Sequence, residues 1–213
     1  MPVRSDITTS NRRILEVARE RFFAEGFSSV TMDDLAETLG MSKKTLYKCY
    51  PSKEALINRL MEHTMAEARG TLSAIKRSDG DFVEKIESLL SVLAFHAARI
   101  SRTFIRDLQR HSPELWRKIE TFRQDRIKEI FLRLITQGIK EGYVNPNLNS
   151  RIFFHAYIGA INSLVNPSVL SVESFSAQDA IKGVLEMFFK GVLTDEGRSR
   201  LSSLEHSHRT HHK

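Results

Sequence analysis

The sequence predicts an all-α protein, and three observations support this prediction. Glycine and proline are scarce, at 10 and 5 of 213 residues, which favours long helices over a turn-rich β fold. Apolar residues recur at helical spacing through most of the chain. Helix start signals divide this pattern, most clearly at Ser112-Pro113-Glu114, which supplies an N-cap, a proline at the first helical position and an acid in the first turn.

The first helix is expected over residues 11–25. Ser10 is a suitable N-cap, the apolar stripe begins at Ile14, and Gly26 ends the helix. Residues 1–9 are polar and lack the apolar segment of a signal peptide, so we expect a flexible arm there.

Residues 31–50 are expected to form two very short helices joined by a tight turn. Thr31 and Asp34 form a variant of the capping box at the start of the first helix. Gly40 ends that helix, because glycine adopts the left-handed conformation at little cost. Ser42 can cap the second helix at once, and the pair then has the geometry of a helix-turn-helix.

The second of these helices is polar and basic around a single apolar side chain, Leu46. Its other positions carry hydroxyl, ammonium and phenol groups: Ser42, Lys43, Lys44, Thr45, Tyr47 and Lys48. These are the donors that a helix in the major groove uses on phosphates and base edges. A solvated basic turn between two core helices is the alternative that the local pattern allows equally.

The stretch from residue 11 to residue 57 agrees with one known family at many spaced positions. The agreeing residues are Ile14, Leu15, Ala18, Phe22, Gly26, Phe27, Thr31, Met32, Asp34, Leu35, Ala36, Gly40, Met41, Ser42, Lys43, Thr45, Leu46, Tyr47, Tyr50, Ser52, Lys53, Glu54, Ala55 and Leu56. This stretch resembles the N-terminal DNA-binding domain of the TetR family of bacterial transcriptional regulators. Lys44 stands where the family often has a small residue, and Lys48-Cys49-Tyr50 replaces its more usual aromatic-His-Phe run. Both departures concern base preference rather than the fold.

The resemblance implies that a three-helix domain at residues 10–51 binds double-stranded operator DNA. The residues expected to face bases are Lys43, Lys44 and Thr45. The residues expected to contact backbone phosphate are Thr31, Ser42, Tyr47, Lys48 and Lys53. Lys53 lies in the first turn of the next helix, where the helix N-terminus already favours an anion.

Residues 52–194 are expected to form a helical domain for ligand binding and dimerisation. The expected helices cover residues 52–75, 82–97, 99–111, 113–140, 150–165 and 176–193, with a loop at residues 166–175. In the family, the first of these helices links the DNA-reading head to the body. The last two combine small residues with a wide apolar face. The resemblance implies that they form a four-helix bundle with a second copy, and internal packing is the alternative.

Aromatic and polar residues of this body are candidates for the lining of a ligand cavity. They are Phe95, His96, Phe104, Leu108, Trp116, Phe122 and His155. Apolar pockets with one or two polar anchors are usual small-molecule sites, although an aromatic stripe at helical spacing also fits an ordinary core. We expect a hydrophobic or aromatic effector, with His96 or His155 as its polar anchor.

Two further features have competing interpretations. The single cysteine, Cys49, excludes an intrachain disulfide and fits a reducing cytoplasm. Its neighbouring lysines would favour a redox-sensing thiolate, and a small core residue is the alternative. Residues 195–213 are expected to be a disordered tail rich in histidine, whose metal affinity would be adventitious because a tail offers no supporting structure.

The composition and the motifs favour one class of function over others. No phosphate-binding loop, nucleophile elbow or zinc-protease motif is present, so we expect neither an enzyme nor a cofactor. The most apolar run, residues 155–165, is shorter than the roughly 20 residues that a membrane span needs. The formal charge of +6 is compatible with a polyanionic partner. We expect a cytoplasmic, homodimeric repressor that a small molecule releases from its operator. The alternative is a helical ligand-binding or interaction protein without specific operator recognition.

Overall fold

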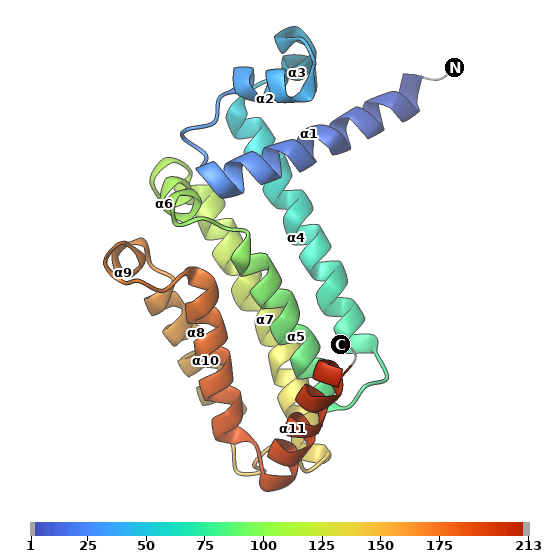
Figure 1. Cartoon of the computed structure of the whole chain (residues 1–213), viewed down its shortest axis with the longest axis vertical. Coiled ribbons are helices and arrows are strands. Elements are labelled where there is room, and N and C mark those ends of the chain that lie inside the picture. Colours follow the sequence, from blue (N-terminus) through green and yellow to red (C-terminus); the bar gives the residue numbers. More distant parts are fainter. Residues whose placement is uncertain (1–2, 211–213) are drawn as a thin grey trace. The chain divides into compact units, whose positions relative to one another are not determined.

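The computed structural model describes residues 3–210, and every regular element among them is a helix (Figure 1). The helices are α1 (Val3–Glu25), α2 (Met32–Leu39), α3 (Lys43–Cys49), α4 (Lys53–Arg77), α5 (Phe82–Ala98), α6 (Arg102–His111), α7 (Pro113–Lys140), α8 (Ser150–Leu164), α9 (Pro167–Val172), α10 (Ala177–Val192) and α11 (Asp195–Thr210). Val144 and Leu193 form an isolated antiparallel bridge. The prediction of an all-α fold is confirmed. None of the described helices is both long enough and apolar enough to cross a membrane.

The chain divides into two compact units, and each unit is built from two segments that are separated in the sequence. Unit 1 contains the chain up to Ala68 together with Arg99–Glu120, and unit 2 contains Arg69–Ala98 together with the chain from Thr121 onward. The long helices α4 and α7 therefore each continue from one unit into the other.

Unit 1 has one hydrophobic core, built from both of its chain segments. Its buried side chains come from α1, the α1–α2 loop, α2, α3, α4 and α6, and they include Ile14, Phe22, Phe27, Leu35, Leu46, Leu56, Leu60, Phe104 and Leu108. The ring centroids of Phe23 in α1 and Phe104 in α6 are 4.7 Å apart. The α6 segment is therefore part of the same core as the helix-turn-helix.

Unit 2 is held together by α5, α7, α8, α10 and α11. Its aromatic centre is Phe131 of α7, whose ring lies 5.2 to 5.6 Å from the rings of Phe153, Phe154, Tyr157 and Phe189. Helix α10 packs against α5 and α8, and α11 packs against α5 (Figure 1).

Both expected unstructured ends are wrong where the structure describes them. Helix α1 already begins at Val3, and neither proline nor glycine occurs between Val3 and Glu25 to stop it from extending. Helix α11 runs from Asp195 to Thr210, where a disordered tail was expected. Residues 1–2 and 211–213, which include His211 and His212, lie outside the described residues.

Tertiary contacts explain why α11 is ordered. The Arg200 guanidinium donates to Asp81 Oδ2 and Glu84 Oε1, both at 2.8 Å, and so ties α11 to the start of α5. The Thr194 hydroxyl accepts a hydrogen bond from the backbone N–H of Gly197 at the first turn of the helix. A single arginine and a capping threonine give no signal in a hydrophobic pattern, so the sequence prediction missed this helix.

The expected loop at residues 166–175 contains the short helix α9. The Asn166 side chain accepts a hydrogen bond from Ser168 N at 2.9 Å, and Pro167 occupies the first helical position. This combination of cap and proline is a helix start signal that the hydrophobic periodicity alone did not reveal.

Candidate nucleic-acid interface

Capping groups fix the first helix of the helix-turn-helix and the turn that follows it. Thr31 and Asp34 form the expected capping box: Thr31 N donates to Asp34 Oδ2 at 2.8 Å, and Asp34 N donates to Thr31 Oγ1 at 3.1 Å. The Thr31 side chain and backbone hydrogen bonds lower the pKa of the Asp34 carboxyl. Gly40 is left-handed at φ 64°, and the N–H of Met41 donates to Ala36 O at 3.0 Å to close the end of α2.

The exposed face of α3 is made of the residues that the sequence predicted for DNA contact. Ser42 caps the helix by accepting from Thr45 N at 3.1 Å, and Leu46 is its one buried residue. The side chains of Lys43, Lys44, Thr45, Tyr47 and Lys48 are exposed, and Tyr47 keeps 45% of its surface in solvent. A seven-residue helix with donors on all but one side can lie in a major groove while its leucine anchors it to the core.

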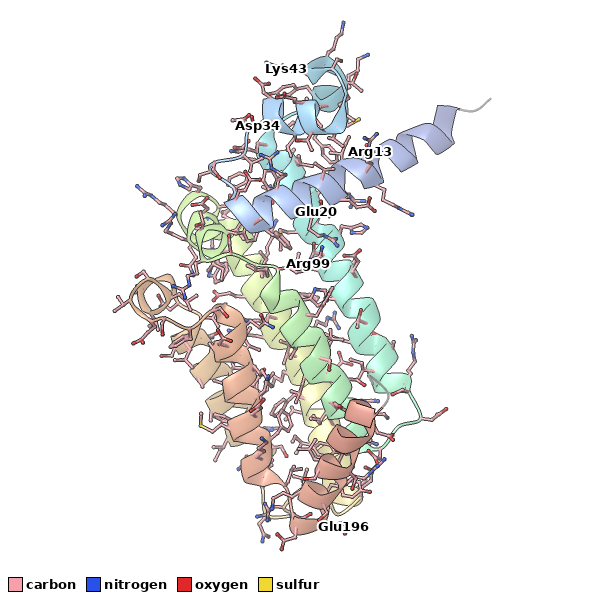
Figure 2. The ribbon with its side chains drawn as sticks, viewed as in Figure 1. Arg13, Glu20, Asp34, Lys43, Arg99 and Glu196 are labelled. Carbon is pink, nitrogen blue, oxygen red and sulfur yellow. The ribbon has the colours of Figure 1, made fainter. Side chains whose placement is uncertain are left out.

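The three lysines of α3 differ in their surroundings. Figure 2 labels Lys43 at the start of α3. Its ammonium donates to Asp33 Oδ2 of α2 at 2.6 Å, and this contact raises the pKa of Lys43. No acidic group among the described residues forms an ion pair with Lys44 or Lys48. The two unpaired ammonium groups are therefore available to an external anion.

Lys53 is placed differently from the lysines of α3. Its ammonium donates to the carbonyl oxygens of Val30 at 2.9 Å and Ser28 at 3.3 Å, and it lies 4.7 Å from the centre of the Phe27 ring. Burial lowers the pKa of Lys53, and the nearby charge of Glu54 offsets part of this shift by raising it. The structure thus gives Lys53 a role in holding the α1–α2 loop, which the sequence did not reveal.

The same loop is held from its other side by α6. The carboxylate of Asp107 is buried, and its Oδ2 accepts from the backbone N–H of Ser28 at 2.8 Å. Gly26 has φ +95°, and a Cβ added there would lie 2.5 Å from Thr103 Cγ2 and 2.8 Å from Asp107 Oδ2. The N–H of Ser101 donates to Phe23 O at 2.8 Å. Helix α6 therefore fixes the point at which the chain leaves α1 for the helix-turn-helix.

The residues predicted to line one ligand cavity do not form one group. Phe104 and Leu108 are packed inside the core of unit 1, and Trp116 lies partly buried against that core. These three are corrected to core residues, because α6 and the start of α7 fold with α1. In unit 2, Phe95 is 59% exposed.

The remaining three candidates also lie in unit 2. The guanidinium carbon of Arg69 lies 5.4 Å from the centre of the Phe122 ring. His155 is exposed on α8. His96 is partly buried on α5, and its ring centre lies 5.7 Å from that of Phe95. Of the predicted residues, His96 therefore stays the better candidate for a polar anchor.

Unit 2 also contains open grooves between the C-terminal halves of α4 and α7. The larger has a volume of about 520 Å³ and is lined by Lys76, Glu129, Arg133, Gln137 and Lys140 among others. Lys76 Nζ donates to Glu129 Oε1 across it at 2.7 Å. None of the residues predicted for ligand binding lines these grooves.

The structure also bears on the expectations for Cys49 and for metal binding. Cys49 is a partly buried thiol packed against the core of unit 1, which agrees with its interpretation as a small core residue. Within the part of the chain that the structure describes, His, Cys, Asp and Glu side chains form no group arranged to hold a metal ion.

Both the sequence and the fold are similar to those of known proteins. Residues 14–60 match the sequence profile of the family "Bacterial regulatory proteins, tetR family". The chain is 28% identical over 190 residues to the uncharacterized HTH-type transcriptional regulator YvaF of Bacillus subtilis (strain 168), covering 87% of this chain and 97% of that protein. It is 33% identical over 173 residues to the nucleoid occlusion factor SlmA of Vibrio vulnificus (strain YJ016), covering 76% of this chain and 86% of SlmA.

The fold is shared with solved structures of low sequence identity. One is the transcriptional regulator FadR from Bacillus subtilis in complex with stearoyl-CoA, with a TM-score of 0.58 and 22% identity, covering 85% of this chain and 98% of that chain. At this identity the likeness establishes the arrangement of helices and leaves the ligand of this chain open.

Proposed function

The chain belongs to the TetR family of bacterial regulatory proteins, and from that premise we propose that it is a homodimeric repressor released from operator DNA by a small molecule. DNA-binding regulation of transcription is the activity of the family. One observation supports the DNA-binding role most directly: α3 buries Leu46 alone and exposes its basic and hydroxyl side chains. Stability alone would not require such a surface on so short a helix.

The contacts that we propose follow from the exposure of each side chain. Lys43, Lys44 and Thr45 would face base edges, where ammonium and hydroxyl groups can donate to guanine or adenine acceptors. The proposed phosphate contacts are Thr31, Ser42, Tyr47 and Lys48. For Lys53, which the sequence also assigned to phosphate, we propose instead that it supports this surface from the loop that it holds.

An exposed apolar face on α8 and α10 supports the proposed dimer. Ile152 keeps 67% and Met187 keeps 68% of its surface in solvent. Exposed small residues, including Gly159 and Gly183, lie on the same two helices and would let a second copy approach closely. Two-fold symmetry of the protein then requires a pseudo-palindromic operator, with half-sites about 34–36 Å apart or a multiple of that distance.

Release by an effector would act through the helices shared by the two units. Helix α4 carries Lys53 at its start and continues into unit 2, so a ligand that shifts α4 changes the support of the helix-turn-helix. A coupling of about 1–3 kcal/mol would weaken operator binding roughly 5- to 150-fold. We propose a hydrophobic or aromatic effector, and the stearoyl-CoA bound by the similarly folded FadR agrees with this class.

Selection from genomic DNA would test the proposed function. The protein is incubated with fragments of its own genome, the retained fragments are sequenced, and the dissociation constant is measured for the recovered site and for a shuffled duplex. We expect a pseudo-palindrome that is bound at least about 10³-fold more tightly than the shuffled duplex. Equal binding of both duplexes would support the alternative, a helical interaction protein without operator recognition.

Two variants connect this measurement to the interface. Tyr47→Ala should weaken binding to the site and to the shuffled duplex by the same factor, because a phosphate contact carries no sequence information. Lys44→Ala should reduce the preference for the site by about 1 to 3 kcal/mol, as expected for a lost base contact. If Lys44→Ala left the preference intact, its assignment as a base-reading residue would be wrong.

A further inference from the structure

The ion pair between Asp33 and Lys43 stands on the surface proposed to meet DNA. Asp33 is in the first turn of α2, and Lys43 is the first residue of α3. Lys43 Nζ lies 2.6 Å from Asp33 Oδ2, and the two side chains keep 65% and 53% of their surface in solvent. Tyr47 lies one turn along α3 from Lys43 and contributes to the electrostatic environment of its ammonium.

Stability does not explain this pair. Ion pairs between side chains that are exposed to this degree contribute little to folding, because water and salt screen the charges. Lys43 also stands at the N-terminus of α3, where the helix dipole disfavours a cation. The other lysines of the same helix, Lys44 and Lys48, have no acidic partner among the described residues. A carboxylate is thus directed at one lysine of the interface alone.

On DNA of random sequence Lys43 has no specific base to contact, so a backbone phosphate would compete with the Asp33 carboxylate for its ammonium. Carboxylate and phosphate oxygens are both anionic acceptors for an ammonium group, so Lys43 must leave Asp33 before it can neutralise phosphate. The Asp33 charge, if left behind at the interface, also repels the DNA backbone. Both effects weaken binding to DNA, and the first also reduces the number of phosphates that the protein neutralises.

We propose that Asp33 is an intramolecular competitor of DNA, which withholds Lys43 from the phosphate backbone and so limits the affinity of the protein for DNA of any sequence. This inference rests on the proposed DNA-binding function. Asp33 is then a determinant of specificity, because binding to random DNA is almost entirely electrostatic whereas operator binding also includes base contacts. A lower affinity for DNA of random sequence leaves more of the protein free to bind its operator.

The salt dependence of binding to random DNA measures the number of neutralised phosphates. We would measure the dissociation constant of the full chain and of Asp33→Asn on a mixed-sequence 40-base-pair duplex between about 50 and 200 mM salt. Release of Lys43 to one more phosphate should steepen the slope of log K against log salt by about 0.9. Over this fourfold range, the variant should then lose about 3.5 times more affinity than the wild type, while binding more tightly at 50 mM.

Two controls separate competition for Lys43 from a general change in charge. Glu37→Gln removes an exposed acid of α2 whose carboxylate has no partner among the described residues, and it should leave the slope unchanged. Asp33→Asn should also leave the slope unchanged in a Lys43→Ala background, because no ammonium remains to be released. Thermal unfolding of each variant shows whether α2 stays folded.

The outcomes distinguish this inference from the proposed function. Equal slopes for the wild type and Asp33→Asn would overturn the competitor role while leaving DNA binding intact. A lower operator affinity in Asp33→Asn, with a flatter sequence preference, would instead show that Asp33 orients Lys43 toward a base, which also overturns the inference. If the wild type bound neither random nor genomic DNA, the proposed function itself would fail.

Discussion

Replacement of Lys53 by methionine tests whether this lysine holds the α1–α2 loop or contacts DNA directly. Methionine keeps most of the aliphatic stem and removes the ammonium that donates to Val30 O at 2.9 Å and Ser28 O at 3.3 Å. The two carbonyl groups belong to the loop that leads from α1 into the helix-turn-helix. Loss of their shared donor should therefore lower both the stability of unit 1 and the order of its DNA-binding surface.

The expected loss of stability follows from the contacts of the ammonium. A hydrogen bond from a charged donor contributes about 1.5–3 kcal/mol, and the partial exposure of Lys53 reduces this to about 1–2 kcal/mol. The contact with the Phe27 ring adds little to the difference, since a methionine sulfur also packs well on an aromatic ring. Burial lowers the pKa of Lys53, which means that desolvation offsets part of the gain. We expect Lys53→Met to lose about 1–2 kcal/mol in free energy of unfolding.

Urea unfolding and the salt dependence of DNA binding together show whether Lys53 holds the loop or contacts phosphate. Lys53→Met should unfold at lower urea, bind all duplexes more weakly, and keep the wild-type salt slope. Lys48→Met is the matched control, because the Lys48 ammonium is exposed and has no acidic partner among the residues that the structure describes: it should keep full stability and lose about 0.9 of the slope. A stable Lys53→Met variant with a slope about 0.9 shallower would refute the loop-holding role and support a direct phosphate contact.

Three further predictions concern the rest of the molecule. Gly26→Ala should destabilise the protein by about 1–3 kcal/mol, measured by urea unfolding, because it strains a positive φ and collides with α6; a neutral effect would contradict the loop geometry. Burial raises the pKa of Asp81, but hydrogen bonds from the α5 backbone and Arg200 outweigh it and hold the pKa below its ordinary value of 3.8. The resulting stabilisation of α11 should be complete above about pH 4 and lost as the pH falls through the lowered pKa, so the hydrogen-exchange protection factors of the α11 amides should fall in acid, and less so in Asp81→Asn. Met187→Glu should convert the dimer to a monomer at micromolar concentration in sedimentation, and a dimeric variant would place the interface elsewhere.

The helix-turn-helix could be predicted from sequence because its determinants are local. The capping box of Thr31 and Asp34, the left-handed Gly40 and the cap at Ser42 each involve residues within a few positions of one another. Such interactions depend on residue type and spacing, and both are visible in the sequence. Leu46 could be assigned to the core for the same reason, as the one apolar residue of a polar helix.

The assignment of the helices after α4 to the two units could not be predicted, because it depends on contacts between segments that are distant in the sequence. Phe104 and Leu108 have the same helical spacing whether they line a cavity or pack on α1, and the structure places them in the core of unit 1. Asp107 gave one usable signal: it is the only acid in α6, among three arginines. Its buried carboxylate holds Ser28 N, a contact that spans 79 positions in the chain.

The four lysines near the interface show why residue type alone does not assign a role. Lys44 and Lys48 are exposed and form no ion pair within the described part of the chain, Lys43 is held by a carboxylate, and Lys53 is held by backbone carbonyls. In the sequence they are equivalent cations within one short stretch, residues 43–53. Two measurements separate them. Replacing an exposed lysine that forms no ion pair changes the salt slope, and replacing a lysine that holds a loop changes the free energy of unfolding. Replacing Lys43 changes the salt slope only when Asp33 has been removed.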